Sequence, residues 1–405
     1  MTLAASAVGR RLHLVHGTRW VHGVNGDAYA RLLRGFDDDP HPAYDEIRRR
    51  GPLWRSRTGV WVTGRQRVAA ELLGHPALAE RAPDGFPVAD GVLPEDAAAP
   101  LIGAAETDGF RARTAHVLGA DAVPEYRPRV AEACARLLAG LGTELDLAAD
   151  VAARLPGEVL ADLFGLTGAR RRRFADGCRH AAVALDSLQC PQTLAVTRRM
   201  RAALDDLAAL LTGPATGPAG GVLSALADAA PPEEAAGLRL PVAVTVLVHR
   251  TTAVLLANAA LAALSRPGEW TRLADEPGRA ARVVAETLRH DPPVAVQAMT
   301  ARTGLKAAGR HIPPGDRIAV VIGAANRDPD TVPDPRGFAP DRTGTPVLHP
   351  ALLHDLAAPL VRVQAETALA TLAARLPALR RTGPVLRARR APVTRAPLRV
   401  PARTA

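Results

Sequence analysis

Residues 286 to 294 read ETLRHDPPV, and this short stretch decides the fold of the chain. Glu286 and Arg289 are three residues apart, so on a helix they lie one turn apart on the same face. Taken alone, such a pair is commonly a minor ion pair on a helix surface. The prolines that follow predict that the helix ends near Asp291. The meaning of the pair therefore depends on the sequence around it.

The predicted secondary structure differs between the two sides of this stretch. Downstream, residues 312 to 342 read IPPGDRIAVVIGAANRDPDTVPDPRGFAPDR, which predicts short strands and turns. Upstream, residues 37 to 76 predict a helix, a β-hairpin and a second helix, whereas residues 121 to 211 and 240 to 264 have helical periodicity. We expect a mainly α fold of the α+β type, with a large helical body and a small β-rich part to which both ends of the chain contribute.

The composition is that of a globular protein that does not bind nucleic acid. The 405 residues are 47% hydrophobic and 23% charged, and only 3% are aromatic, which predicts a helical, aliphatic core. The net charge is +10, but Lys306 is the only lysine, and the arginines are mixed with 41 acidic residues along the chain. No helix-turn-helix, zinc-finger or RRM signature accompanies them, so we predict no nucleic-acid partner.

The sequence predicts a cytoplasmic protein. Its three cysteines are odd in number and form no CxxC pair, which argues against a disulfide framework. The N-terminus shows no long apolar core ahead of a cleavage site, so we predict no signal peptide. The most apolar segment, residues 240 to 264, carries His249 and Arg250 at its centre, where an arginine would cost about 2.5 to 3.5 kcal/mol in a bilayer. We therefore expect a buried helix in place of a membrane span.

Common catalytic motifs are missing. The chain has no P-loop, GxGxxG, GxSxG or HExxH motif. His13, His16 and His22 lie in a segment without cysteine or an obvious fourth ligand, so we predict no metal site there. The segment HPALLHDLAAPLVRVQAE, residues 349 to 366, places two histidines and an aspartate in a loop before a helix. From its residues alone, that loop could be a metal site, a catalytic dyad or a segment without chemistry.

In order and spacing, the ETLR helix, the strands and turns after it and the helix–hairpin–helix before it resemble a bacterial cytochrome P-450. The resemblance implies a P-450-like fold over residues 37 to 405. It leaves residues 1 to 36 as an N-terminal extension and a candidate partner-binding segment. It also implies that Glu286, Arg289 and Arg342 form a buried structural triad, which packs the helical body on the loop region and is costly to break.

The same resemblance implies that the haem ligand is missing. The family places a cysteine in the loop before a helix that begins like APLVRVQAE, and counting back from that helix puts Asp355, within one residue, in the cysteine's place. Glycines that let the backbone approach the porphyrin are replaced by residues such as His349 and Ala357. An oxygenase needs a thiolate to split the O–O bond, and a carboxylate does not do this. His354 could in principle ligate iron, but the missing glycines argue against it. We predict no bound cofactor.

Two further haem-related features of the family are also altered in this sequence: the proton-relay pair and the motif that binds the haem propionate. The long central helix of a P-450 carries an acid–alcohol pair that relays protons to oxygen, and the corresponding residues 247 to 252 read LVHRTT. Val248 replaces the glycine that makes room for oxygen, and Arg250 replaces the acid, whereas Thr251 remains. Arginine stays protonated at any working pH, so it cannot relay protons. The HxxxR motif that clamps the haem propionate has Gly109 in place of its histidine.

With this profile, the chain resembles the haem-less P-450-like auxiliary proteins that activate deoxysugar glycosyltransferases in macrolide and anthracycline biosynthesis. Its N-terminal stretch is nearer the anthracycline branch. The resemblance implies a protein that is not an enzyme and that binds a glycosyltransferase. Aromatic residues are favoured interface anchors, so Trp20 and Tyr29 are candidate contacts. Two alternatives remain at this point: a haem-binding monooxygenase with an atypical ligand, and a small-molecule carrier that uses the vacant haem cavity.

Overall fold

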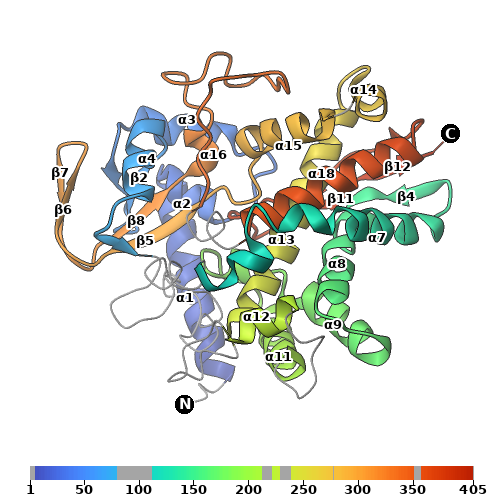
Figure 1. The fold of residues 1–405 in the computed structure, drawn as a ribbon. Helices are drawn as coiled ribbons and strands as arrows, with labels where there is room; N and C mark the ends of the chain where they lie inside the picture. The colour runs from blue at the N-terminus through green and yellow to red at the C-terminus, as the bar shows by residue number, and fades with distance from the viewer. Residues whose placement is uncertain are drawn as a thin grey trace.

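The computed structural model describes residues 5–79, 112–211, 221–228, 239–276, 278–350 and 357–404. Its larger part is a body of helices, drawn in green, yellow and red in Figure 1. The longer helices of this body are α7 (Arg127–Ala139), α8 (Leu155–Leu163), α9 (Gly168–Ala181), α11 (Leu194–Leu211), α13 (Arg239–Leu264), α15 (Arg279–His290) and α18 (Ala358–Arg375). Shorter helical elements connect them: η1 (Val123–Tyr126), η2 (Leu147–Ala152), α10 (Ala184–Ser187), α12 (Val222–Asp228) and α14 (Glu269–Asp275).

Helix α13 lies at the centre of the body and packs against α8, α15, α18 and η2 (Figure 1). Residues Leu240–Leu264 are long and apolar enough to cross a membrane by length and composition, but 89% of their most apolar window is buried inside the protein. A helix that is apolar on all sides needs protein on all sides, which the neighbouring helices supply. Helix α13 therefore joins most of the body into one core.

A mixed five-stranded sheet forms the β-rich part, in the order β1-β2-β8-β5-β3. Strand β2 pairs in parallel with β8, with Trp61 opposite Ile318, and β8 pairs antiparallel with β5. The strands are β1 (Trp54–Arg55), β2 (Trp61–Thr63), β3 (Leu78–Ala79), β5 (Gln297–Ala301) and β8 (Arg317–Val320). Helices α3 (His41–Arg49), α4 (Gln66–Leu73) and α16 (Ile322–Ala325) pack near this sheet, and α2 (Ala28–Leu33) packs against α3.

Three smaller strand groups complete the molecule. They are the hairpin β6 (Leu305–Ala307) and β7 (Arg310–Ile312), the pair β10 (Leu386–Arg387) and β11 (Pro397–Arg399), and the sheet of β4 (Glu144–Asp146), β12 (Pro401–Arg403) and β9 (Arg380–Arg381). The parallel β2–β8 pairing joins strands from the two halves of the sequence. The predicted mainly helical fold, with a β part from both ends of the chain, is thus confirmed.

The N-terminal segment is packed onto the rest of the chain through Asp27. This buried aspartate caps helix α2 (Ala28–Leu33), where it accepts a hydrogen bond from the amide of Ala30 at 2.9 Å. Its other oxygen accepts from the Ser56 hydroxyl at 2.8 Å and from the Arg57 amide at 2.6 Å. These bonds to Ser56 and Arg57 hold α2 against the β-hairpin of β1 and β2. Helix α1 (Ala5–Val24) lies along α2 at the edge of the molecule (Figure 1).

The prediction that Tyr29 contacts a partner protein is wrong, because a partner contact must lie at the surface and Tyr29 does not. It is completely buried, in a cluster with Leu33, Tyr44 and Val62. The physical reason is the periodicity of α2, which turns Tyr29 and Leu33, four residues apart, toward the sheet. Trp20, on α1, keeps 41% of its surface exposed.

Candidate functional site

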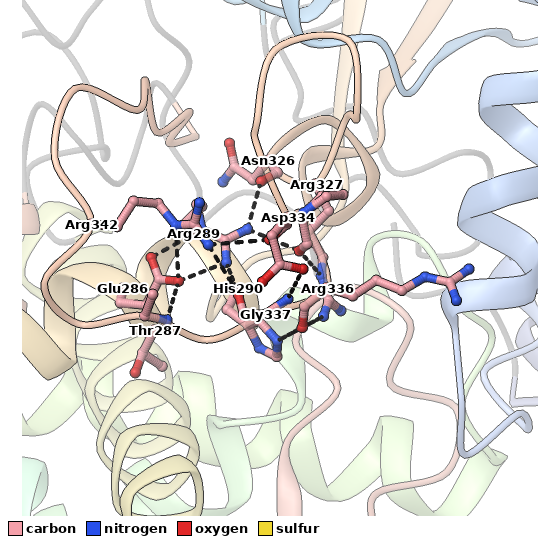
Figure 2. Close-up of polar contacts among 12 residues, drawn as sticks. Glu286, Thr287, Arg289, His290, Asn326, Arg327, Asp334, Arg336, Gly337 and Arg342 are labelled. Atoms are coloured by element: carbon pink, nitrogen blue, oxygen red, sulfur yellow. Dashed lines mark hydrogen bonds and ion pairs between the residues drawn. The ribbon is translucent and has the colours of Figure 1, made fainter. Parts of the chain in front are cut away.

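The predicted triad residues lie together at the end of α15 (Figure 2). Arg289 donates two hydrogen bonds to the Glu286 carboxylate, at 2.7 and 3.0 Å. The Arg342 side chain reaches the same carboxylate at 3.4 Å. The side chains of Glu286 and Arg289 are almost fully buried, at 5% and 1% exposure, and that of Arg342 is 12% exposed. Two buried cations thus share one buried anion.

The triad also holds the chain segment that contains Arg342. Arg289 donates to the carbonyl oxygens of Gly337 at 2.7 Å and Pro335 at 3.1 Å, and Glu286 accepts from the amide of Ala339 at 2.8 Å. Burial alone would raise the pKa of Glu286, but the hydrogen bonds from Arg289 and from the Ala339 amide outweigh it and hold that pKa below its usual range. The carboxylate therefore stays charged and ties the loop to α15.

The centre of α13 carries an ion pair formed by Arg250, the residue predicted to stand in the place of the family's proton-relaying acid. Arg250 contacts Asp186 on α10 at 3.0 Å and donates to the Thr394 hydroxyl at 2.9 Å. The Asp186 side chain is completely buried and accepts from the amides of Val393 and Thr394 at 3.0 and 2.9 Å. The Thr394 hydroxyl donates to its second oxygen at 2.6 Å. The guanidinium is thus committed to α10 and to the loop before β11.

The neighbours of Arg250 on α13 are buried and offer no replacement for the acid. Val248 and Thr251 are completely buried, and the Thr251 hydroxyl donates to the carbonyl of Leu247, one turn back along the helix. His249 is buried beside α8, where a Cβ added to Gly157 would stand 3.6 Å from the imidazole. Burial, followed by the positive charge of Arg250, lowers the pKa of His249 to about 4. The imidazole is therefore neutral at neutral pH.

The three cysteines lie in helical surroundings remote in sequence from the loop before α18. Cys134, on α7, is 4.0 Å from the carbonyl of Ala368, and Cys190 is 3.7 Å from the carbonyl of Arg34. Burial raises the pKa of the thiols of Cys134 and Cys190 to about 12 and also raises that of Cys178. Each thiol is therefore protonated at neutral pH, whereas the family's iron ligand is a thiolate.

Part of the predicted haem region lies outside the described residues. This applies to Asp355, the residue assigned to the cysteine position, and also to His354 and Gly109. Ala357, which immediately precedes α18, is completely buried, and His349 is half-buried. In the described ranges, no group of three or more histidine, cysteine or acidic side chains could hold a metal ion.

A haem group does not fit the residues that the structure describes at this site. The three cysteines are buried thiols that do not belong to the loop before α18, and Arg250, predicted to stand in the place of the proton-relaying acid, is already paired with Asp186. No mechanistic step can therefore be derived through this group from the residues present.

An open cleft borders the N-terminal turns of α18. Its volume is about 660 Å³, within the range of small-molecule sites. The apolar residues lining it include Leu118, Val123, Leu288, Val361 and Val363, and Arg127 and Glu366 form an ion pair at 3.1 Å among the lining residues. No residue of α13 lines it, so this cleft is not the space beside Val248 and Arg250.

Sequence reasoning missed the partners of Arg250. Asp186 and Thr394 are 64 and 144 residues away from it, and neither belongs to a recognisable motif. A second ion cluster was also missed, in which the buried Arg279 contacts the buried Glu269 at 2.6 Å and the exposed Asp341 at 2.7 Å. One signal was available: Asp186 lies in the largely apolar stretch AAVALDSL, residues 181 to 188, which suggests a buried partner without identifying it.

Comparisons with known proteins agree with this architecture. Residues 280–343, which contain all three triad residues, match the family model described as cytochrome P450. The chain is 39% identical to protein DesVIII of Streptomyces venezuelae, over 98% of this chain and 94% of that protein. It is also 39% identical to protein AknT of Streptomyces galilaeus, over 98% and 96%.

A third relative carries the family in its name. Cytochrome P450 family protein EryCII of Saccharopolyspora erythraea is 33% identical over 99% of both chains. Among solved structures, ligand-free CYP164A2 of Mycobacterium smegmatis is 26% identical, with a TM-score of 0.76 over 93% of this chain and 99% of that one. The chain therefore belongs to the cytochrome P450 family.

Proposed function

We propose that this chain is a non-catalytic auxiliary protein that binds and activates a TDP-deoxysugar glycosyltransferase in the biosynthesis of a polyketide antibiotic of the anthracycline or macrolide type. One observation carries the proposal: the P450 frame is intact, with the Glu286 triad in contact, while Arg250 at the centre of α13 is bound in an ion pair with Asp186. The full-length relatives DesVIII and AknT support the same assignment.

The proposed mechanism is thermodynamic linkage. A protein that binds one conformation of a transferase more tightly than another shifts the population toward that conformation, by no more than the difference in binding free energy. Couplings of about 1 to 3 kcal/mol raise the population of the active conformation about 5- to 150-fold. No residue of this chain needs to touch the sugar nucleotide or the acceptor. The half-exposed Trp20 of the N-terminal segment is one proposed contact with the transferase.

Co-expression with the glycosyltransferase of the same pathway tests the proposal. We expect sugar transfer to rise at least about fivefold when this chain is present, the lower end of typical couplings. Equal transfer with and without the wild-type chain would overturn the proposal.

Absorption spectroscopy tests the monooxygenase alternative. We expect the purified protein to show no Soret band even when haem is supplied during expression, because none of its three cysteines is placed to provide a thiolate. A haem-loaded preparation that inserts oxygen into a substrate would replace the proposed function with an enzymatic one.

A small-molecule carrier is a second candidate, and the cleft beside α18 is the observation that favours it. Its apolar walls suit an acceptor such as a polyketide aglycone. Calorimetry with the aglycone alone separates the two functions, because a carrier binds it stoichiometrically without the transferase. Ala115→Trp, at an exposed position that lines the cleft, is expected to abolish that binding and to leave transferase activation unchanged if the protein is an activator.

A further inference from the structure

Helix α1 exposes a row of apolar side chains along its outer face. Leu14, Val21 and Val24 are 72%, 58% and 71% exposed. Positions seven and three residues apart fall on one side of an α-helix, so the three side chains form a single stripe with Gly17 and Thr18 between them. Scattered exposed apolar residues need no explanation, but a continuous stripe on one helix does.

The opposite face of α1 packs against the rest of the chain. Val8 and Leu12 are buried there and pack against Leu194. Further along, Arg19 is buried and its guanidinium donates to the carbonyl of Gln189. The inner face therefore anchors α1 to the body, and the outer stripe contributes nothing to that attachment.

Gly17 lies at the middle of the stripe and has no explanation in this chain's own packing. Glycine is among the least favourable residues in a helix interior. A Cβ added at this position would meet no atom of the described residues within 4 Å, and the backbone there is ordinary helix. The absence of a side chain leaves a shallow notch between Leu14 and Val21, where another backbone can approach closely.

The charges beside the stripe indicate what kind of surface it fits. Helix α1 contains no acidic residue, and Arg10, His13 and His22 line the same depression as the apolar side chains. In two copies of this chain that face each other through α1, Arg10 would meet a helix with basic residues and no acidic partner, which opposes self-association. An apolar helix with acidic residues along its edges would complement the stripe in both shape and charge.

We propose that the stripe of Leu14, Gly17, Thr18, Val21 and Val24 is the docking surface for an acid-edged apolar helix of the partner glycosyltransferase. This inference rests on the proposed function and identifies the surface to which the glycosyltransferase binds. The glycine notch lets the two helix axes approach at the short end of the usual 8 to 10 Å range. A helix of 20 residues is about 30 Å long, enough to form one side of a protein interface.

The test measures the affinity of variants for the purified transferase and their activation of it. Leu14→Asp and Val21→Asp place an unpaired charge in the contact, and we expect each to weaken binding at least about tenfold, with a parallel loss of activation. Gly17→Ala is the sharper variant. It is expected to raise the thermal stability of the chain, because alanine favours the helix, and to weaken binding, because its methyl group fills the notch.

Leu398→Asp is the matched control. Leu398 is 62% exposed, close to the value for Leu14, but it lies on β11, so we expect its variant to bind and activate like the wild type. If the wild type activates the transferase and the α1 variants do so equally, the docking surface is wrong and the proposed function stands. If the wild type neither binds nor activates, both fail together.

Two further measurements on the same variants decide whether the stripe binds the transferase, a second copy of this chain or a lipid surface. We expect the wild-type chain alone to be monomeric by sedimentation and not to float with phosphatidylglycerol vesicles. A dimer that Leu14→Asp dissociates would assign the stripe to a second copy of the chain. Vesicle binding that Leu14→Asp abolishes would assign it to a lipid surface. Either result overturns the proposal.

Discussion

Glu286 neutralises two arginines and anchors the loop that carries one of them. Neither arginine can lose its proton at working pH, so the carboxylate must stay charged for the group to remain buried. The hydrogen bonds to Glu286 from Arg289 and Ala339 achieve this. A buried charge network of this kind is weak evidence for high stability, but it is costly to break from one side.

We expect Glu286→Gln to lower the free energy of unfolding by about 3 to 5 kcal/mol, because Arg289 and Arg342 remain buried without a counter-charge. Urea denaturation measures this. Glu46→Gln is the control, because Glu46 forms partly exposed pairs with Arg49 and Arg50 and its loss is expected to cost no more than about 1 kcal/mol. Similar losses in the two variants would show that the triad is not a structural lock.

At the scale of elements, the Arg250–Asp186 pair joins α13, α10 and the loop before β11. The pair gives these segments a fixed arrangement that aliphatic contacts alone do not specify. Contacts between aliphatic side chains have no directional requirement, whereas a largely buried guanidinium and a buried carboxylate must meet at hydrogen-bonding distance.

A double-mutant cycle with Asp186→Asn and Arg250→Met tests whether the pair is coupled. The asparagine keeps an oxygen to accept from the amides of Val393 and Thr394 while removing the charge. We expect a coupling free energy of more than about 1 kcal/mol in urea denaturation, because each single change leaves the other partner buried and unpaired. Additive single effects would contradict this assignment.

At the scale of the whole molecule, buried histidines make stability depend on pH. Burial, followed by the positive charge of a nearby arginine, lowers the pKa of the buried His249 and of the partly buried His290 to about 4. The reference value for an unfolded histidine is 6.5, so between about pH 6.5 and pH 4 the unfolded chain binds more protons than the folded one. Stability is therefore full above this window and falls as the pH drops through it.

His249 alone is expected to contribute a slope of up to about 1.4 kcal/mol per pH unit within the window. His249→Leu, which removes the titrating group from an apolar site, should reduce the loss of stability between pH 7 and pH 4.5. Unfolding free energies of the two proteins across that range measure the difference. His13→Leu, at an exposed position, is the control, and identical pH profiles for wild type and His249→Leu would contradict the prediction.

The sequence by itself determined the fold class, offered the triad as a candidate and predicted an altered haem region. Each of these follows from residue type at a definite spacing: a glutamate and an arginine one turn apart, an arginine in place of an acid, and no cysteine before the APLVRVQAE helix. Thiolate chemistry requires a particular side chain, so its absence can be recognised without coordinates.

Only the tertiary structure decided which side chains meet across long separations and which face solvent. Tyr29 and Trp20 are both aromatic residues of the N-terminal segment, but α2 turns Tyr29 into the core whereas α1 leaves Trp20 half-exposed. The pairing of Arg250 with Asp186 and Thr394 depends in the same way on how α13, α10 and the C-terminal loop pack. Local sequence determines the periodicity of a helix, but the neighbouring elements determine which of its faces is covered.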